Sequence, residues 1–269
     1  MNEPVLNDHD RACWVRLELF ARMHARSREH QRRVAAALRV TERALKTSRL
    51  PSVSWSAGKD STALSALVLS VDPTVELASE KDDLDYPGEE EYVTQLAARW
   101  GAQLTILRPP VSPSQWISEN RDKLAMGDDF HSRAAGLSKA CFYNVMTEYD
   151  RTRDLVFLGL RAEESVHRQK ARAANGIDYV RRDGIRICTP IADWTGIDVF
   201  AFLFAREIDP LHVYRCIGFM HEREPWRLRK SWWIPGDRGK HGGATWLRRY
   251  YPSLFQRLLE WFPRARSFA

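Results

Sequence analysis

Cysteine is scarce in this sequence. The 269 residues contain four cysteines, Cys13, Cys141, Cys188 and Cys216, and no two of them form a CxxC pair. Such isolated cysteines argue against a disulfide framework and against a local zinc or iron–sulfur motif. We therefore expect reduced thiols and no iron–sulfur cluster.

Long apolar runs are also missing. A run such as "VFAFLFA" at 199–205 falls far short of the roughly 20 residues that a membrane-spanning helix needs. The polar N-terminus lacks a signal-peptide pattern. These absences predict a cytoplasmic protein without a membrane partner. The 44% hydrophobic and 28% charged fractions are typical of a chain that folds.

Positive charge exceeds negative charge. The chain has 41 lysines and arginines against 35 aspartates and glutamates, a net charge of +6. This excess permits binding of nucleic acid and suits a phosphate-bearing substrate equally well.

The chain divides by pattern into three segments. Residues 10–46 have apolar side chains at helical spacing and predict a helical extension, which Pro51 closes. From residue 52, short β-prone runs alternate with helical stretches, which predicts an α/β fold with a parallel sheet covered on both faces. We expect strands at 53–55, 75–78, 104–107, 155–158 and 185–188, and helices at 62–71, 89–100, 138–149 and 198–206. The predicted boundaries are 1–48 for the extension, 49–206 for the α/β domain and 207–269 for a basic, aromatic region packed on the core.

The stretch "VSWSAGKDST", residues 53–62, leads from a predicted strand into an apolar-periodic helix. A helix that begins directly after a strand leaves its first N–H groups without internal partners, and these donors with the helix dipole form an anion site. Small residues at 56–58 let a phosphate approach, and Lys59 adds a positive charge. Asp60 fits a helix cap or a Mg²⁺ ligand. The GxxxxGK[ST] spacing of a Walker A loop is absent, and a plain βα turn with an aspartate cap is the competing interpretation.

The same loop carries a family resemblance. "SAGKDS" at 56–61 resembles the SxGxDS pyrophosphate loop of the adenine nucleotide α-hydrolase superfamily, and its lysine is similar to the phosphoadenosine phosphosulfate (PAPS) reductase-like branch. Later stretches agree with that branch in order and spacing: "DDLDYPGEEEYVTQLAARWG" (82–101), "FLGLRAEESVHR" (157–168), "TPIADWTGIDVFAFL" (189–203) and "DPLHVY" (209–214). The resemblance covers residues 50–218 and implies a Rossmann-like (HUP-type) sheet.

The resemblance also implies roles for single residues. The loop would hold the terminal phosphates of ATP, or the phosphosulfate end of PAPS or adenylylsulfate, with Mg²⁺. Arg161 and Arg168 would direct guanidinium groups at phosphate oxygens, with Glu163 or Glu164 holding one of them; a surface salt-bridge cluster is the alternative. The implied binding residues are Ser56, Ala57, Gly58, Lys59, Asp60, Ser61, Arg161 and Arg168, with Lys59, Asp60 and Arg161 as catalytic residues and Asp60 as the Mg²⁺ ligand.

Other candidates are weaker. Asp82 and Asp85 follow the second predicted strand and would meet a ribose hydroxyl or a metal, or form a solvated loop; the reductases read more like D-T-G there. Cys141 would be a reactive thiol beside Lys139, or it would pack in the core. In the C-terminal region, "RKSWWIPGDRGKHGGATWLRRYYP" (229–252) mixes basic and aromatic residues that stack on bases or pack in the core.

The predicted function is that of an ATP pyrophosphatase. The E-C-G-x-H tail and the clustered cysteines of sulfonucleotide reductases have no match in the sequence. We therefore expect cleavage of ATP between its α and β phosphates, adenylylation of an acceptor, and release of pyrophosphate. The purpose would be sulfur transfer or nucleic-acid modification, with nucleic acid as acceptor and a sulfur-donor protein as partner. The alternatives are sulfonucleotide reduction through Cys141 or Cys216, and a non-catalytic nucleotide- or nucleic-acid-binding module.

Overall fold

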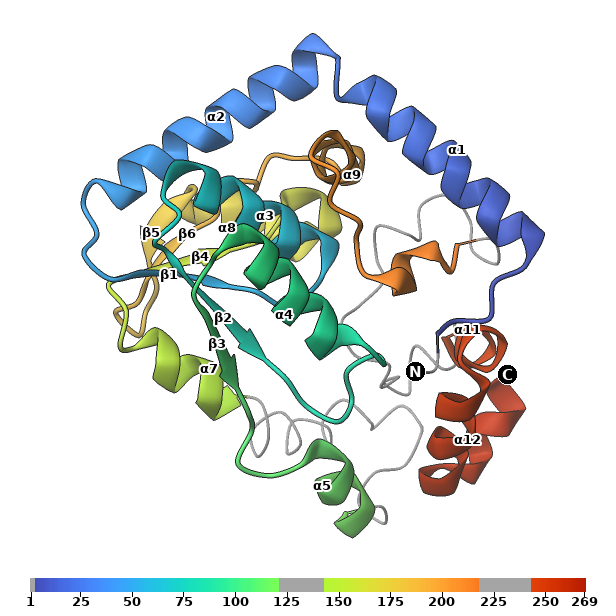
Figure 1. The fold of residues 1–269 in the computed structure, drawn as a ribbon. Coiled ribbons are helices and arrows are strands. Elements are labelled where there is room, and N and C mark those ends of the chain that lie inside the picture. Colours follow the sequence, from blue (N-terminus) through green and yellow to red (C-terminus); the bar gives the residue numbers. More distant parts are fainter. Residues whose placement is uncertain (1–2, 121–142, 218–242) are drawn as a thin grey trace.

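A six-stranded sheet forms the centre of the computed structural model, which describes residues 3–120, 143–217 and 243–269 (Figure 1). The strand order is β3-β2-β1-β4-β6-β5, and all neighbours pair in parallel except β5, which is antiparallel to β6. The strands are β1 (Pro51–Ser54), β2 (Glu76–Glu80), β3 (Leu104–Leu107), β4 (Leu155–Leu158), β5 (Asp178–Val180) and β6 (Arg186–Cys188). The predicted α/β fold with a parallel sheet is confirmed, except that the edge strand β5 is antiparallel.

The strand order reverses between β1 and β4. Helices α3 (Lys59–Val71) and α4 (Glu89–Trp100) connect β1, β2 and β3 in one direction across the sheet. The chain then crosses back through α7 (Tyr143–Asp150) to β4. Since such crossovers are right-handed and both run in the same direction along the sheet, α3 and α4 lie on the same face of the sheet. Ligands in such folds bind beyond the carboxyl ends of the strands at this reversal.

The main core lies between the sheet and the helices over it. Val53 of β1, Leu64 of α3 and Phe202 of α9 (Gly196–Ala205) are fully buried in one apolar cluster. Helix α2 (Arg28–Leu45) covers α3 from outside through small residues such as Ala37 and Ala44. The start of α3 is therefore held by packing on both of its sides.

The N-terminal extension consists of two helices that meet at a corner over α9 (Figure 1). Helix α1 (Asp8–His24) packs on α9, where the ring of Trp14 meets Phe200 and Phe204 edge-on. Helix α2 begins after Ser27, whose hydroxyl accepts from the amide of His30 at 3.2 Å. The helical prediction for this extension is correct, but the pattern did not indicate the break between the two helices.

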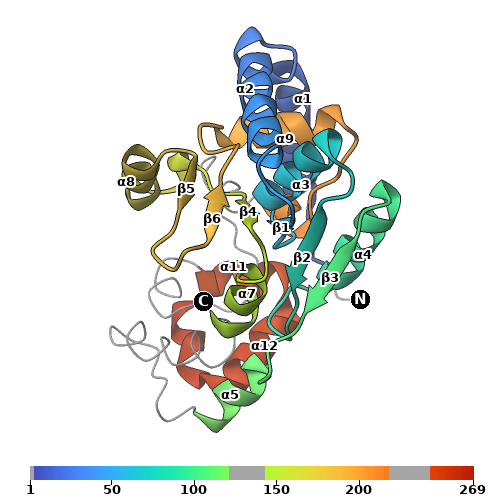
Figure 2. The same ribbon diagram turned by 90° about the vertical axis from the view of Figure 1, so that its left-hand side faces the viewer.

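The C-terminal region adds two more helices, α11 (Ala244–Tyr250) and α12 (Pro252–Trp261), which lie below α1 (Figures 1 and 2). Pro252 occupies the first turn of α12 because its missing N–H is not needed there. The rings of Trp246, Tyr250 and Tyr251 are buried in a second apolar cluster with Tyr86. These rings thus pack in the core, and the basic stretch before residue 243 lies outside the described residues.

Two elements were not predicted. Strand β5 is a three-residue edge strand with a mostly exposed pattern, and α8 (Val166–Asn175) has no buried residue, so neither carries an apolar signal. The remaining elements are α5 (Pro113–Glu119) and the short 3-10 helices η3 (Ala162–Glu164), η4 (His212–Arg215) and η7 (Pro263–Phe268). Among the helices of the described residues, none combines the length and apolar character that a bilayer crossing requires.

Candidate active site

The loop between β1 and α3 lies at the reversal point of the sheet. Gly159, directly after β4, presses against the first turn of α3: a Cβ built on this glycine would lie 2.8 Å from the amide nitrogen of Ser61 and 2.9 Å from its Cα. No other residue type fits so close to a backbone. The carboxyl end of β4 and the amino end of α3 therefore form one continuous surface.

Ser61 ties the loop together. Its hydroxyl donates to the carbonyl of Gly58 at 3.0 Å and accepts from the amide of Ser56 at 3.2 Å. The hydroxyl groups of Ser56 and Ser61 are also 3.1 Å apart. Ala57 has the positive φ of 56° that this tight turn requires. The predicted small-residue loop is thus fixed by its own hydrogen bonds.

Tyr214 closes the loop from a distant part of the chain. The amide of Lys59 donates to its hydroxyl at 3.0 Å, and the Lys59 ammonium lies 5.6 Å from the centre of its ring. The amides at the start of a helix lack intrahelical acceptors, and Tyr214 satisfies one of them. The sequence pattern included this tyrosine at the end of "DPLHVY" but did not predict its contact with Lys59.

Four charged side chains form a row beside the loop. Asp60 accepts from Lys59 Nζ through Oδ2 and from Arg161 Nε through Oδ1, each at 2.6 Å. Arg161 Nη1 also donates to Glu163 Oε2 at 2.6 Å, and this oxygen accepts from the amide of Gly196 at 2.6 Å. The side chains of Lys59 and Arg161 are 1% and 0% exposed. Both cations are therefore removed from water and share Asp60 as a partner.

Burial and pairing shift the pKa values of this row. Burial is the largest influence on Lys59, and it lowers the pKa of the ammonium group in spite of the attraction of Asp60. Burial alone would raise the pKa of Asp60, but Lys59 and Arg161 outweigh it and lower the pKa of this carboxyl group. Burial would lower the pKa of Arg161, but Asp60 and Glu163 raise it. Asp60 and Arg161 are thus held in their charged forms.

Arg168 lies one helical turn beyond this row, at the start of α8. It forms an ion pair with Glu164, whose second contact is with the amide of Arg161 at 3.1 Å. Arg161 and Arg168 also line one small cavity of about 40 Å³. Glu163 therefore holds the side chain of Arg161, and Glu164 holds that of Arg168.

Comparisons with known proteins show the family and agree with the fold. Residues 50–222 match the family model of the phosphoadenosine phosphosulfate reductase domain, which is more than half of the chain. The chain belongs to this family. A crystal structure of PAPS reductase from Candida auris, a phosphate complex, is similar with a TM-score of 0.53 and 16% identity over 66% of this chain and 83% of that chain.

Two further structures resemble the PAPS reductase domain more distantly. FMN adenylyltransferase from Candida glabrata in complex with ATP has a TM-score of 0.47 and 11% identity, over 77% of this chain and 67% of that chain. NH3-dependent NAD synthetase from Campylobacter jejuni has a TM-score of 0.45 and 13% identity, over 90% of this chain and 96% of that chain. No match was found among curated proteins.

Asp60 of this PAPS reductase domain is a poor fit for a Mg²⁺ ligand in the observed arrangement. Both of its carboxylate oxygens accept from cations, Lys59 on one side and Arg161 on the other. A metal ion would have to displace one of these buried groups, which is costly. We therefore assign Asp60 to the positioning of Lys59 and Arg161 and derive no step through Mg²⁺.

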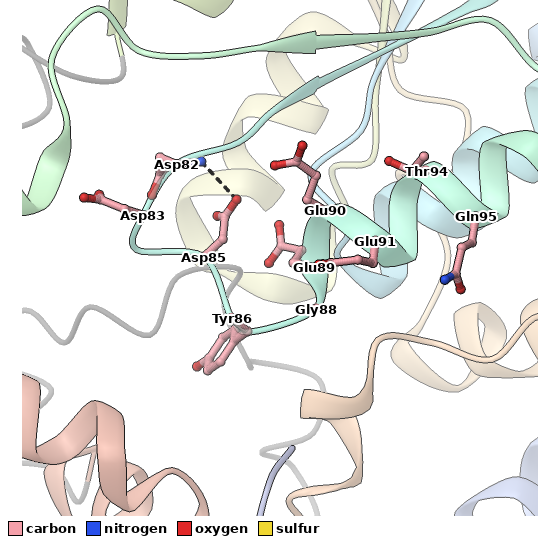
Figure 3. A pocket seen from close by; sticks show the side chains of 10 residues that line it. All are labelled: Asp82, Asp83, Asp85, Tyr86, Gly88, Glu89, Glu90, Glu91, Thr94 and Gln95. Atoms are coloured by element: carbon pink, nitrogen blue, oxygen red, sulfur yellow. Dashed lines mark hydrogen bonds between the residues drawn. The ribbon is translucent and has the colours of Figure 1, made fainter. Parts of the chain in front are cut away.

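The acidic segment after β2 forms a separate pocket of about 560 Å³ (Figure 3). Asp82 and Asp85 belong to the loop that leads into α4, and Glu89 lies in the first turn of that helix. The side chain of Lys81 is 1% exposed and pairs with Glu89 at 2.5 Å and with Asp85 at 3.7 Å. The predicted carboxylates are thus gathered at the end of β2, but part of their charge neutralises a buried lysine.

The two described cysteines of the PAPS reductase domain, Cys188 and Cys216, have little thiolate character. Burial raises the pKa of Cys188 to about 12 and also raises the pKa of Cys216. Both thiols therefore stay protonated at neutral pH and are poor nucleophiles. Lys139 and Cys141 lie outside the described residues.

Proposed function

We propose that this PAPS reductase domain protein binds ATP at residues 56–61 and catalyses adenylyl transfer with release of pyrophosphate. The observation that carries the proposal is the pair of buried cations, Lys59 and Arg161, which share Asp60 beside the start of α3. A plain βα turn with an aspartate cap needs neither cation, and burying two of them is unfavourable unless anions accompany them.

The charges of the row favour an anionic ligand. Asp60 is its one largely buried carboxylate, because the Glu163 side chain is 49% exposed. The Nη2 group of Arg161 is buried, and no acceptor among the described residues forms a hydrogen bond with it. A phosphate oxygen would provide that acceptor and would add a second anion to the buried part of the row, where two cations share one largely buried carboxylate.

The proposed reaction transfers AMP. The acceptor attacks the α-phosphorus of ATP, a new bond forms from the acceptor atom to phosphorus, and the bond to the β-phosphate oxygen breaks. Negative charge grows on the bridging oxygen as pyrophosphate leaves. Fixed amides at the start of α3 together with Lys59 and Arg161 would stabilise that charge, because they are already oriented and shielded from water.

ATP is favoured over a sulfonucleotide because reduction of the latter requires a nucleophilic thiol. Cys216 is the candidate among the described residues, and burial raises the pKa of its thiol. It lies among core aromatic residues such as Trp246, whose indole N–H donates to the Cys216 carbonyl at 3.1 Å. Such a thiol does not attack a sulfonucleotide readily.

The test uses ATP labelled at the α-phosphate, with Mg²⁺ and nucleic acid. We expect pyrophosphate and either AMP or an AMP-labelled acceptor. We expect Lys59→Ala and Arg161→Ala to lower the rate by about 10²-fold or more, as for other donors to transition-state charge. Arg181→Ala is the matched control, because Arg181 pairs with Asp183 on the surface at 2.6 Å. ADP as the product, or full activity in both site variants, would refute the proposal.

A further inference from the structure

Two histidines and an aspartate converge outside the candidate active site, where the α1–α2 corner meets α9 (Figure 1). Asp198 Oδ1 lies 2.8 Å from His24 Nε2 and 3.0 Å from His30 Nδ1. The three ligand atoms all lie within 4.8 Å of one another. They come from three different helices, so the fold brings together a nitrogen–nitrogen–oxygen donor set that the sequence does not reveal.

The carboxylate of Asp198 is rigidly held by its other oxygen. Oδ2 accepts from the amide of Thr195 at 2.8 Å, from its hydroxyl at 2.6 Å and from Arg33 Nη1 at 2.6 Å. Asp198 is fully buried in the first turn of α9. Oδ1 is thus free of these contacts and directed at both imidazole rings. Outer contacts of this kind orient metal-ligating carboxylates.

The spacing of the donor atoms is close to that of a tetrahedral metal. With Zn–N and Zn–O bonds of about 2.0 Å, neighbouring ligand atoms of a tetrahedron lie roughly 3.3 Å apart. The two distances from Asp198 Oδ1 to the imidazole nitrogens, 2.8 and 3.0 Å, are slightly shorter. Side-chain shifts of a few tenths of an ångström would therefore separate the three ligand atoms enough to admit the ion.

The local charge and exposure are compatible with a cation. Arg33 is the nearest opposing charge, but Glu29 pairs with it at 2.6 Å, so the two carboxylates outnumber the guanidinium group. His30 is nearly buried at 4% side-chain exposure, whereas His24 is 17% exposed. Solvent can thus reach the site beside His24 and supply a water molecule as the fourth ligand.

We propose that His24, His30 and Asp198 bind one zinc-type divalent cation that fastens the α1–α2 corner to α9. Two imidazoles and one carboxylate suit Zn²⁺, and Ni²⁺ or Cu²⁺ bind such donors as well. The competing interpretation is a metal-free anchor in which each imidazole donates one hydrogen bond to Asp198. The metal site and the metal-free anchor differ in whether the protein binds a divalent cation. The proposed metal site does not depend on the proposed nucleotide chemistry.

The experiment uses the full chain, stripped with a chelator and then titrated with Zn²⁺ by calorimetry. We expect one equivalent of Zn²⁺ to bind, and the thermal midpoint to rise by about 5 °C at a hundredfold excess over the dissociation constant. Co²⁺ in place of Zn²⁺ should give the intense visible absorption of a tetrahedral complex. His24→Ala should lose this binding at least tenfold, and the exposed His167→Ala should retain it.

Arg33→Gln leaves all three ligands in place but removes one of the contacts that orient the Asp198 carboxylate. We expect it to bind Zn²⁺ about tenfold more weakly than the wild-type protein, as the loss of such outer contacts does in other metal sites. His24→Ala is chosen because His24 is the most exposed of the three ligands, and its circular dichroism spectrum reports whether it folds. Absence of stoichiometric Zn²⁺ binding by the wild-type protein, or equal binding by a folded His24→Ala variant, would overturn the proposal.

Discussion

Asp60→Asn tests whether the buried row of charges is a single unit. The substitution keeps the shape of the side chain but leaves Lys59 and Arg161 without their shared carboxylate. Removal of one partner from a buried ion pair costs about 3–5 kcal/mol. Asp60 is 14% exposed, and Arg161 retains Glu163, so we expect the lower end, about 3 kcal/mol of unfolding free energy.

In thermal unfolding this loss corresponds to a midpoint about 6–12 °C below that of the wild-type protein. Circular dichroism and urea unfolding would measure it. Asp8→Asn is the control, because Asp8 and Arg11 form an exposed pair and we expect no measurable change. Adding Lys59→Met to Asp60→Asn should restore part of the loss, because one of the stranded cations is then gone. A midpoint for Asp60→Asn within about 1 °C of the wild type would refute the reasoning.

The stability difference between the wild-type protein and Asp60→Asn should depend on pH. The pKa of Asp60 is lowered from its ordinary value of 3.8 in the folded protein. Its carboxylate therefore contributes stability above the unfolded pKa, and this contribution is lost as the pH falls through the lower folded pKa. The stability gap between wild type and Asp60→Asn should be constant from pH 6 to 8 and should narrow below about pH 4.

Two further substitutions and one labelling experiment test other parts of the structure. Gly159→Ala should destabilise the fold by about 1–3 kcal/mol in urea unfolding, because its Cβ would collide with the backbone of Ser61; unchanged stability would contradict the close approach. Gly58→Ala has ordinary contacts of 3.4 Å and should keep its stability while losing ATP affinity in calorimetry. A thiol reagent at pH 8 should label Cys13 but not Cys188 until the protein unfolds, as peptide mass spectrometry would show; rapid native labelling of Cys188 would contradict its burial.

Local sequence was sufficient to predict the loop between β1 and α3 and the helix α4. The helix prediction of 89–100 matches α4, because Glu89–Glu91 favour the start of a helix and Gly101 takes the left-handed conformation at its end. Strands β3 and β4 also match, because each is a short apolar run between polar segments. In these elements the chemistry of neighbouring residues decides the structure.

Contacts between distant segments could not be predicted in this way. Tyr214 reaches Lys59 across 155 positions, and Asp198 reaches His24 across 174 positions. The need for glycine at position 159 follows only from the pairing of β4 with β1, which brings Gly159 against the backbone of Ser61. The sequence offered Asp60 as a helix cap or a Mg²⁺ ligand, and it did not predict that Lys59 and Arg161 pair with both of its carboxylate oxygens.

The first turn of α9 has a consequence for attempts to shorten this protein. A chain that starts at residue 49 would remove every helix that shelters this turn from the N-terminal side. Asp198 would then lose its partners His24, His30 and Arg33. Phe200 would lose its contact with Trp14, so its apolar ring would be exposed to water. The minimal working fragment should therefore keep its first two helices, even though the family match begins only at residue 50.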